Sequence, residues 1–176
     1  MRPRHVCRGG GRDGRLMEIR NATYGDLDVL MEVFAKARRY MEALGNPDQW
    51  RGGYPARALV AGDIGLGQCY ACVEDGRVVG TFVLALGEEP TYARIDGAWK
   101  NNRPYATLHR IASSGARRGL ADEVLSWAFA REGNLRGDTH ADNLPMQRAF
   151  ERNGFERCGT IWVKDGSPRI AYQREK

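Results

Sequence analysis

Between residues 105 and 173 the apolar residues change their spacing several times, and this order limits the available folds more than any other feature. Alternation at a period of two is typical of strands, and spacing by three or four residues is typical of helices. The resulting order is strand, helix, strand, helix and a final hairpin. Because it combines βα units with hairpins, it predicts a mixed sheet flanked by helices.

Further patterns extend this prediction back to residue 17. The pair Asp75-Gly76 between two apolar runs is typical of a β-hairpin. Thr23 followed by Asp26 resembles a capping box at the start of a helix. The expected strands cover residues 17–20, 68–74, 78–86, 105–113, 135–140, 159–164 and 169–173, and the expected helices begin near residues 23, 56, 119 and 143. We predict an α/β fold with one mixed, mostly antiparallel sheet of six or seven strands and helices on both faces. We expect residues 17–176 to form a single domain.

The net charge of +5 does not indicate a nucleic-acid partner. Residues 1–16 contain five arginines and one aspartate, so the rest of the chain carries a net charge of only +1. A nucleic-acid-binding domain needs a basic patch on its folded part. Because residues 1–16 are rich in arginine and glycine and show no periodicity, we predict a disordered N-terminal extension.

No membrane partner is expected either. The longest apolar runs are short, as at residues 82–86, whereas a spanning helix needs about 20 apolar residues. The basic N-terminal segment is not followed by an apolar stretch, as a secretory signal would be. A cytoplasmic location is therefore the default expectation.

Two groups of side chains could suggest a metal or a redox centre. Cys69 and Cys72 have C-x-x-C spacing, but they lie in a predicted strand, where residues three apart face opposite sides. We expect reduced thiols there. Asp138, His140 and Asp142 follow one another at a spacing of two, and capping of the next helix is the simpler role. We predict no metal site.

Residues 108–121 combine a strand, a basic turn with glycines and the start of a helix. The first helical turn leaves backbone N–H groups unpaired, and the helix dipole adds partial positive charge there. Gly119 allows close backbone approach, and Arg117 and Arg118 would add mobile positive charge. These features indicate a phosphate or pyrophosphate site. An ordinary strand–helix connection with solvated arginines is the alternative.

Residues 142–155 form the second notable segment. Asp142 or Asn143 can cap the helix, and Pro145 suits its first turn. The helix ends at Asn153-Gly154, which is typical of a helix stop. By itself this segment indicates only a well-capped helix.

Together the two segments resemble motifs A and B of the GNAT acetyltransferase superfamily. Motif A, Gln/Arg-x-x-Gly-x-Gly/Ala, is represented by residues 116–121, with Ala116 in its first position. Motif B, Asn-x-x-Ala-x-x-x-Tyr-x-x-x-Gly-Phe, is represented by residues 143–155, with Phe150 in place of the tyrosine. The resemblance extends in element order from residue 17 to residue 172.

This resemblance implies acetyl-CoA as the co-substrate. Its pyrophosphate would lie on backbone N–H groups of the motif A turn, and its pantetheine arm would pair with the strand before it. Asn143 would contact the pantetheine or hold the following helix. The implied cofactor-binding residues are Ile111, Ala112, Ser113, Ala116, Arg117, Arg118, Gly119, Leu120, Ala121, Asn143 and Met146.

His109 is the candidate catalytic residue, as base or acid, because its reference pKa near 6.5 suits proton transfer. A histidine hydrogen-bonded within the sheet is the alternative. Strand alternation predicts that His109, Ile111 and Ser113 share one face. Phe150 has no proton to give, so the leaving thiolate must obtain its proton from another group or from water.

The acceptor site is expected beside the first helices and their loop. Gln49, Trp50 and Tyr54 could stack on or hydrogen-bond an acceptor there, or their rings could anchor the loop. The leading hypothesis is an N-acetyltransferase that acts on an amine of a small molecule or peptide. The alternative is a non-catalytic acyl-CoA-binding or regulatory module, which Ala116 and Phe150 favour. The sequence leaves open whether the chain forms a homodimer.

Overall fold

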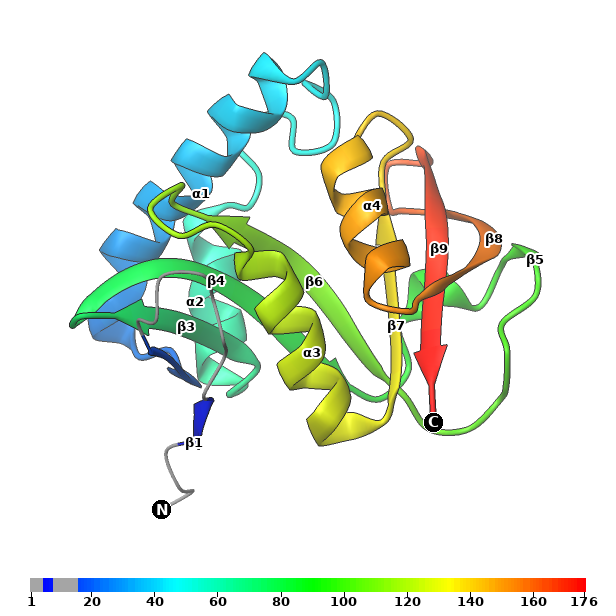
Figure 1. Ribbon diagram of the computed structural model, residues 1–176. Coiled ribbons are helices and arrows are strands. Elements are labelled where there is room, and N and C mark those ends of the chain that lie inside the picture. The colour runs from blue at the N-terminus through cyan, green and yellow to red at the C-terminus, as the bar shows by residue number, and fades with distance from the viewer. Residues whose placement is uncertain (1–4, 8–15) are drawn as a thin grey trace.

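In this computed structural model, which describes residues 5–7 and 16–176, one mixed sheet forms the centre of the molecule (Figure 1). Its strand order is β1-β2-β3-β4-β6-β7-β9-β8-β5. The strands are β1 (His5–Cys7), β2 (Met17–Asn21), β3 (Cys69–Glu74), β4 (Arg77–Leu86), β5 (Asp96–Gly97), β6 (Ala106–Ser113), β7 (Asn134–Thr139), β8 (Glu156–Trp162) and β9 (Pro168–Glu175). The predicted mixed sheet is confirmed. It has nine strands in the described residues because β1 and the two-residue β5 extend its edges.

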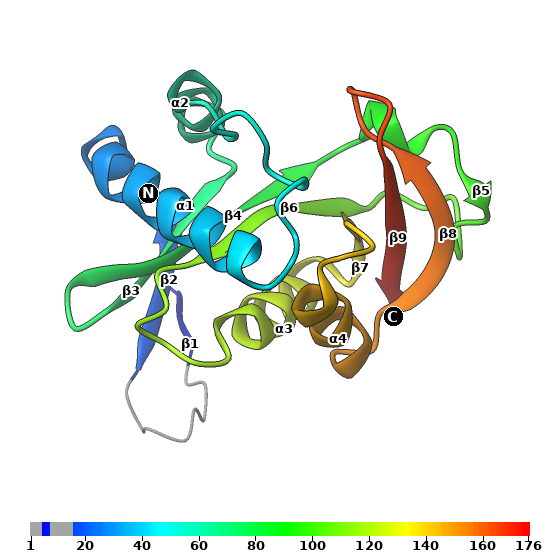
Figure 2. The same cartoon turned by 90° about the horizontal axis from the view of Figure 1, so that it is seen from above.

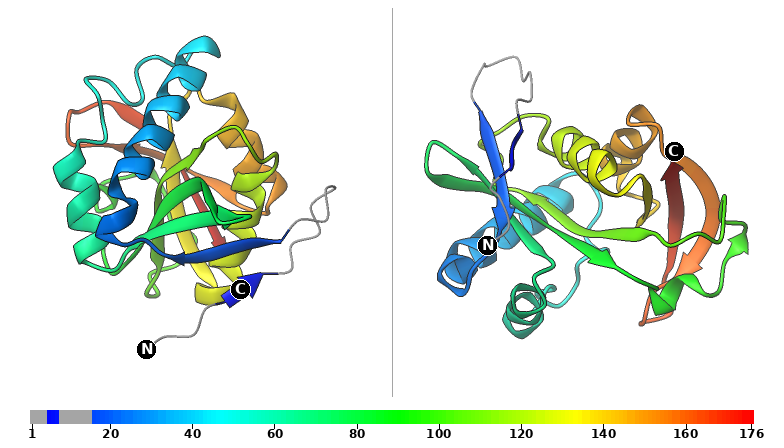
Figure 3. Two further views of the ribbon diagram at one scale, coloured as in Figure 1. Left: turned by 90° about the vertical axis from the view of Figure 1, so that its left-hand side faces the viewer. Right: turned by 90° about the horizontal axis from the view of Figure 1, so that it is seen from below.

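Helices cover both faces of the sheet, as predicted (Figure 2). α1 (Leu27–Ala43) and α2 (Arg57–Gly65) lie on one face, and α3 (Leu120–Glu132) and α4 (Leu144–Arg152) lie on the other. Two short 3-10 helices complete the fold: η1 (Tyr24–Asp26) lies between β2 and α1, and η2 (Pro90–Tyr92) lies between β4 and β5. The right-hand view of Figure 3, from below, shows the sheet between these two layers of helices.

One pair of strands interrupts an otherwise antiparallel sheet. β6 and β7 run parallel, and their pairing extends only from Ala106 opposite Leu135 to Leu108 opposite Gly137. Beyond these residues the two strands separate, as Figure 1 shows. In the diverging part, the backbone N–H and C=O groups that β6 and β7 turn toward each other therefore do not pair between the two strands.

Each face of the sheet has its own apolar core. Phe82, Leu108 and Phe150 belong to the core under α3 and α4, whereas Phe34 and Val60 belong to the core under α1 and α2. Burying one such side chain stabilises the fold by roughly 1.5–3 kcal/mol. The chain therefore needs both cores to hold helices on both faces.

Local sequence signals account for two of the connections. The Thr23 backbone N–H donates to the Asp26 carboxylate at 2.8 Å, and α1 follows directly after η1. Asp75 and Gly76 both have positive φ, 48° and 74°, which is what a two-residue hairpin turn requires. The predicted capping box and hairpin are thus confirmed.

The two cysteines of the C-x-x-C sequence lie on opposite faces, as predicted. Cys69 belongs to the core under α1 and α2, and Cys72 belongs to the core under α3 and α4. Burial raises the pKa of the Cys72 thiol to about 12 and also raises the pKa of Cys69. Neither thiol is therefore prepared for nucleophilic chemistry at neutral pH.

The N-terminal segment is described only in part. Residues 5–7 form β1, which pairs antiparallel with β2, so these three residues do not fit the prediction of a disordered extension. The rest of that prediction, for residues 1–4 and 8–15, lies outside the described residues. Among the helices that are described, none has the length and apolar character that a membrane crossing requires.

Candidate active site

Two cavities meet where β6 and β7 separate. The first, of about 640 Å³, lies beside the start of α3 and is named the α3 cavity here. The second, of about 590 Å³, is bounded by α2, the α1–α2 loop and the turn after β8, and is named the α2 cavity. The residues that line both cavities are Met41, Trp50, Ile111, Asn143 and Met146. These shared residues mark a place where two ligands could touch.

The start of α3 presents free backbone donors to the α3 cavity. Gly119 is the residue before the helix and has φ +74°, a left-handed conformation that glycine adopts without strain. Gly119, Leu120 and Ala121 precede or begin the helix, so their N–H groups have no carbonyl of a preceding helical turn to bond. Ten of the sequence-predicted cofactor residues line this cavity, and Ala116 does not. The turn therefore has the donors of an anion site.

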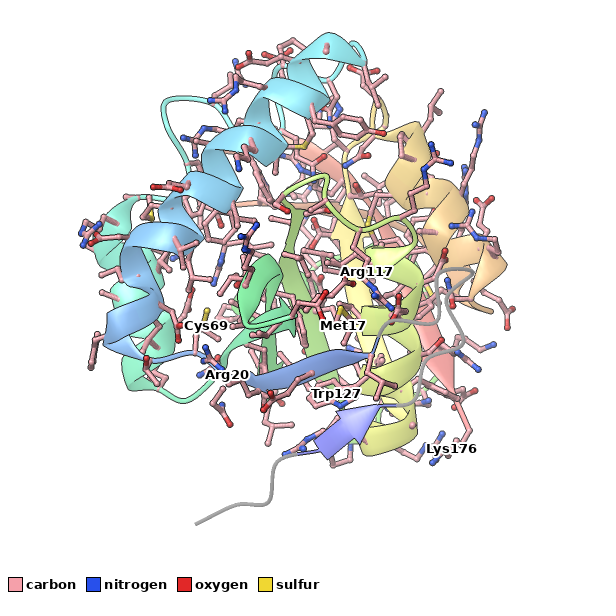
Figure 4. All side chains as sticks on the ribbon, turned by 60° about the vertical axis from the view of Figure 1, so that its left-hand side comes forward. Met17, Arg20, Cys69, Arg117, Trp127 and Lys176 are labelled. Carbon is pink, nitrogen blue, oxygen red and sulfur yellow. The ribbon has the colours of Figure 1, made fainter. Side chains whose placement is uncertain are left out.

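Arg117 differs from its prediction as a mobile cation. Its side chain is only 6% exposed, and its guanidinium pairs with Glu74 of β3 and with Glu123 of α3, the latter at 2.8 Å. Figure 4 shows Arg117 at the beginning of α3, with Trp127 further along the same helix. Both carboxylates raise the pKa of Arg117. Arg118 is exposed and forms no ion pair with the described residues, so it is the arginine that stays available to a ligand.

A bulge in β6 corrects the prediction that His109, Ile111 and Ser113 share one face. Arg110 has φ +52°, and the register between β4 and β6 shifts beside it. The alternation of side chains therefore reverses at this residue. Leu108 and Ile111 both contact the core under α3 and α4, whereas the Arg110 guanidinium donates to Asp63 of α2 at 2.6 Å.

His109 consequently lies in the α2 cavity with a carboxylate partner. Its Nε2 is 3.1 Å from Glu89 Oε2, and no described residue hydrogen-bonds its Nδ1. The Glu89 carboxylate also accepts from the Thr91 backbone N–H and hydroxyl. The hydrogen bond with His109 is the main cause that lowers the pKa of Glu89 to about 2. Glu89 therefore fixes the imidazole and leaves one ring nitrogen for proton transfer.

Asp138 is the matching residue on β7. It is the first residue after the paired segment, and its carboxylate accepts a hydrogen bond from the Tyr92 hydroxyl at 2.6 Å. Removal from bulk water raises the pKa of Asp138, and the Tyr92 hydrogen bond opposes this. Asp138 stays partly accessible because it lines the α2 cavity. His109 and Asp138 thus lie on the two strands at the start of their separation.

Asn143 joins the start of α4 to the α1–α2 loop. Its side-chain oxygen accepts from the Met146 backbone N–H at 3.2 Å, which caps the helix, and its amide donates to Gln49 at 2.8 Å. Of the roles considered for Asn143, the structure shows the one of holding the following helix. Its position between the two cavities also leaves it within reach of a ligand.

Phe150 of α4 fills the space that a side chain at position 137 would need. Its ring stacks on Tyr172 with centroids 4.8 Å apart, and its Cζ lies 2.8 Å from the place of a Cβ on Gly137. The absence of a side chain at Gly137 therefore allows α4 to approach the sheet. The ring is 2% exposed and offers no proton donor.

The three predicted acceptor residues line the α2 cavity together with His109. Trp50 also packs against Phe34 with ring centroids 5.7 Å apart, so it also anchors the α1–α2 loop.

The sequence did not indicate Glu89, Asp63 or Arg169 as residues of this cavity. No local signal places them in this cavity, because Glu89 reaches His109, Asp63 reaches Arg110 and Arg169 reaches Gln49 only in the folded chain. Within the described ranges, no group of three His, Cys, Asp or Glu side chains is arranged to hold a metal ion.

Comparison with known proteins agrees with this geometry. A GNAT-family acetyltransferase from Streptococcus agalactiae 2603 has a TM-score of 0.83 and 34% identity, over 91% of this chain and 95% of that chain. A GNAT-family acetyltransferase from Listeria monocytogenes 4b F2365 has a TM-score of 0.73 and 19% identity, over 98% and 100%. The aminoglycoside acetyltransferase AAC(6')-Ib in complex with coenzyme A and kanamycin has a TM-score of 0.61 and 21% identity, over 91% and 95%.

No protein-family model and no curated protein matches the sequence. The similarity to the streptococcal protein extends over nearly the full length of both chains, so the present chain belongs to the GNAT family of acetyltransferases. The predicted family and fold are confirmed. The structural neighbours support an acetyltransferase role.

Proposed function

We propose that this protein is an N-acetyltransferase that transfers an acetyl group from acetyl-CoA to an amine of a small molecule or peptide. The observation that supports this most is the meeting of the α3 and α2 cavities between β6 and β7. One cavity offers anion donors at a helix start, and the other offers a histidine. AAC(6')-Ib, which shares the fold, has been solved in complex with acetyl-CoA.

The residues of the α3 cavity fit acetyl-CoA. The N–H groups of Gly119, Leu120 and Ala121, with Arg118, would bind its pyrophosphate. The β6 backbone from Ile111 to Ser113 lies beyond the paired segment of β7, so it can bond the pantetheine arm as an added strand. When bound, acetyl-CoA supplies the thioester that the amine attacks. The backbone N–H of Ile111 would stabilise the carbonyl oxygen as it gains charge.

His109 would act as the general base. Glu89 holds Nε2, so Nδ1 is the nitrogen that removes the proton from the attacking amine. Phe150 gives no proton to the leaving thiolate, so water reaching the junction of the cavities would supply it. This chain would therefore differ from family members with a tyrosine at this position of motif B in the group that protonates the leaving thiolate.

Calorimetric titration and a thiol-release assay together test the proposal. Acetyl-CoA and free CoA are titrated into the protein, and thiol release is then followed over a broad panel of amines. We expect saturable one-to-one binding and release with at least one amine. Binding without release would favour the non-catalytic acyl-CoA-binding module, which Ala116 and Phe150 support. Absence of acetyl-CoA binding at millimolar concentration would overturn both the acetyltransferase proposal and the acyl-CoA-binding alternative.

Cytoplasmic location and dimer formation stay predictions.

The role of His109 gives a sharper test. His109→Ala should lower kcat by about 100-fold or more, the usual contribution of general base catalysis, while the Kd of acetyl-CoA stays unchanged. Glu89→Gln should lower kcat less and shift its pH profile, because it acts through the imidazole. His140→Ala is the matched control, since His140 lines neither cavity. Unchanged kcat in His109→Ala would show that His109 is structural.

A further inference from the structure

Arg169, at the start of β9, is a buried cation without a carboxylate partner. It is 6% exposed and lines the α2 cavity. Its guanidinium makes three hydrogen bonds, all to neutral oxygens: Ser167 Oγ and Pro168 O at 2.9 Å, and Gln49 O at 3.5 Å. No ion pair joins it to any described residue. Because a guanidinium has five N–H donors, two remain for a ligand.

The other charges of the α2 cavity are largely neutralised in pairs. Arg110 contacts Asp63 at 2.6 Å, and Glu89 contacts His109 at 3.1 Å. Asp138 accepts only the Tyr92 hydroxyl among the described side chains and forms no ion pair with Arg169. Beside the β6–β7 separation the cavity therefore contains one carboxylate without an ion pair, Asp138, and the neighbouring strand β9 carries one guanidinium without an ion pair, Arg169. Asp165, a further carboxylate of the lining, is exposed and accepts from Ser167 instead of Arg169.

This arrangement fits a ligand that carries both charges. A buried charge is costly unless it is paired, so an acceptor that leaves Arg169 unpaired would bind poorly. A carboxylate satisfies the two free donors of Arg169 in a forked, charge-assisted contact. An ammonium group next to it would lie toward Asp138 and His109, where its proton has to be removed.

We propose that the acceptor is a free amino acid or a similar small amino-carboxylic acid, with its carboxylate on Arg169 and its amine between Asp138 and His109. This inference rests on the proposed acetyltransferase function. Arg169 is then the residue that determines specificity. A polycationic acceptor fits less well, because five carboxylates and four basic side chains line the cavity and leave no large excess of negative charge.

Matched substrates test the inference on the unaltered protein. Each of the twenty L-amino acids is compared with its own amide, which keeps the amine and the side chain but lacks the carboxylate. Spermidine and kanamycin represent polycations. Thiol release from acetyl-CoA is measured under steady state. We expect at least one amino acid to exceed its amide in kcat/KM by about 100-fold, because an unpaired buried group rejects an analogue strongly.

Variants then locate the contact. Arg169→Gln should lower kcat/KM for the preferred amino acid by about 100-fold, mostly through KM, and should remove its advantage over the amide. Arg169→Lys should restore part of the loss, because it keeps the charge without the fork. Arg148→Gln is the matched control: Arg148 is an exposed arginine of α4 that lines neither cavity and forms no ion pair with the described residues, and we expect a change below about 3-fold.

The outcomes separate the two proposals. Equal rates with acids and amides, preference for spermidine or kanamycin, or an unchanged kcat/KM in Arg169→Gln would overturn the amino-acid inference and leave the acetyltransferase function intact. Thiol release with none of the amines would overturn the proposed function, and the inference would fall with it. If Arg169→Gln does not fold, as judged by circular dichroism, the acid–amide comparison decides alone.

Discussion

At the scale of single residues, two left-handed backbone conformations shape the candidate site. Gly119, with φ +74°, turns the chain so that the first N–H groups of α3 face the α3 cavity. Arg110, with φ +52°, reverses the side-chain alternation of β6. A left-handed conformation costs a non-glycine residue roughly 1–2 kcal/mol. At Arg110 the hydrogen bonds to Asp63 and to Tyr54 offset that cost.

Substitution of Gly119 tests the anion site. Gly119→Glu places a carboxylate where the pyrophosphate would bind, so we expect the Kd of acetyl-CoA to rise by at least about 100-fold through charge repulsion and bulk. Gly76→Glu is the matched control, because Gly76 has the same φ of +74° but lines neither cavity. Both variants should lose similar stability. Equal Kd values in the two variants would place the cofactor elsewhere.

At the scale of elements, the junction of β2 and α1 contains a strong ion pair. Arg20 donates to both carboxylate oxygens of Asp26, at 2.8 and 2.9 Å, and Asp26 also accepts from the Thr23 backbone N–H. The Arg20 guanidinium is the main cause that holds the pKa of Asp26 well below its usual range. The pair therefore fixes the angle at which α1 leaves the sheet.

This ion pair makes stability depend on pH. A carboxyl whose pKa is lowered by folding stabilises the native state fully above its unfolded pKa, near 3.9, and loses that contribution as the pH falls through the folded value. We expect the free energy of unfolding, measured in urea, to fall less between pH 5 and about pH 2 in Asp26→Asn than in the unaltered protein. Asp28→Asn, whose carboxylate is 85% exposed, is the control. Identical pH profiles for Asp26→Asn and the unaltered protein would contradict this role of Asp26.

At the scale of the whole molecule, two cavities with largely different walls meet where β6 and β7 separate. The α3 cavity takes its walls from α3, α4 and the end of α1, and the α2 cavity takes its walls from α2 and the loops above the sheet. One ligand in each cavity would therefore approach the other at the residues that both cavities share. This arrangement depends on β9, which pairs with β7 and carries the buried Tyr172 and Arg169.

Truncations test which segments the molecule needs. Removal of residues 1–16 should change the free energy of unfolding by less than about 2 kcal/mol, because the described part of that segment pairs only three residues with β2. The Kd of acetyl-CoA should stay the same. Removal of residues 168–176 is the contrasting truncation, and we expect it to abolish folding because it takes away β9. A large loss of stability in the first truncation would show that residues 1–16 pack on the domain.

Local patterns in the sequence were sufficient for the element order, the mixed sheet, the Asp75-Gly76 hairpin and the glycine turn before α3. Each of these depends on neighbours in the chain, because backbone conformation and apolar spacing are local properties. The resemblance of two motifs also predicts that Asn143 lies near a ligand, and the strand ahead of motif A makes His109 the candidate catalytic residue; both stay predictions. Local patterns could not indicate the bulge at Arg110, which arises from a shift in register against β4.

Only the tertiary structure decided which charges meet. Arg117 contacts Glu74, 43 residues away, and Tyr92 contacts Asp138, 46 residues away. His109 of β6 contacts Glu89, which follows the end of β4, only because β4 and β6 are neighbours in the sheet. Arg169 stays without a carboxylate because β9 places it on the wall of the α2 cavity. Such contacts depend on strand order and on helix placement, which no local pattern specifies, and they determine what the site can bind.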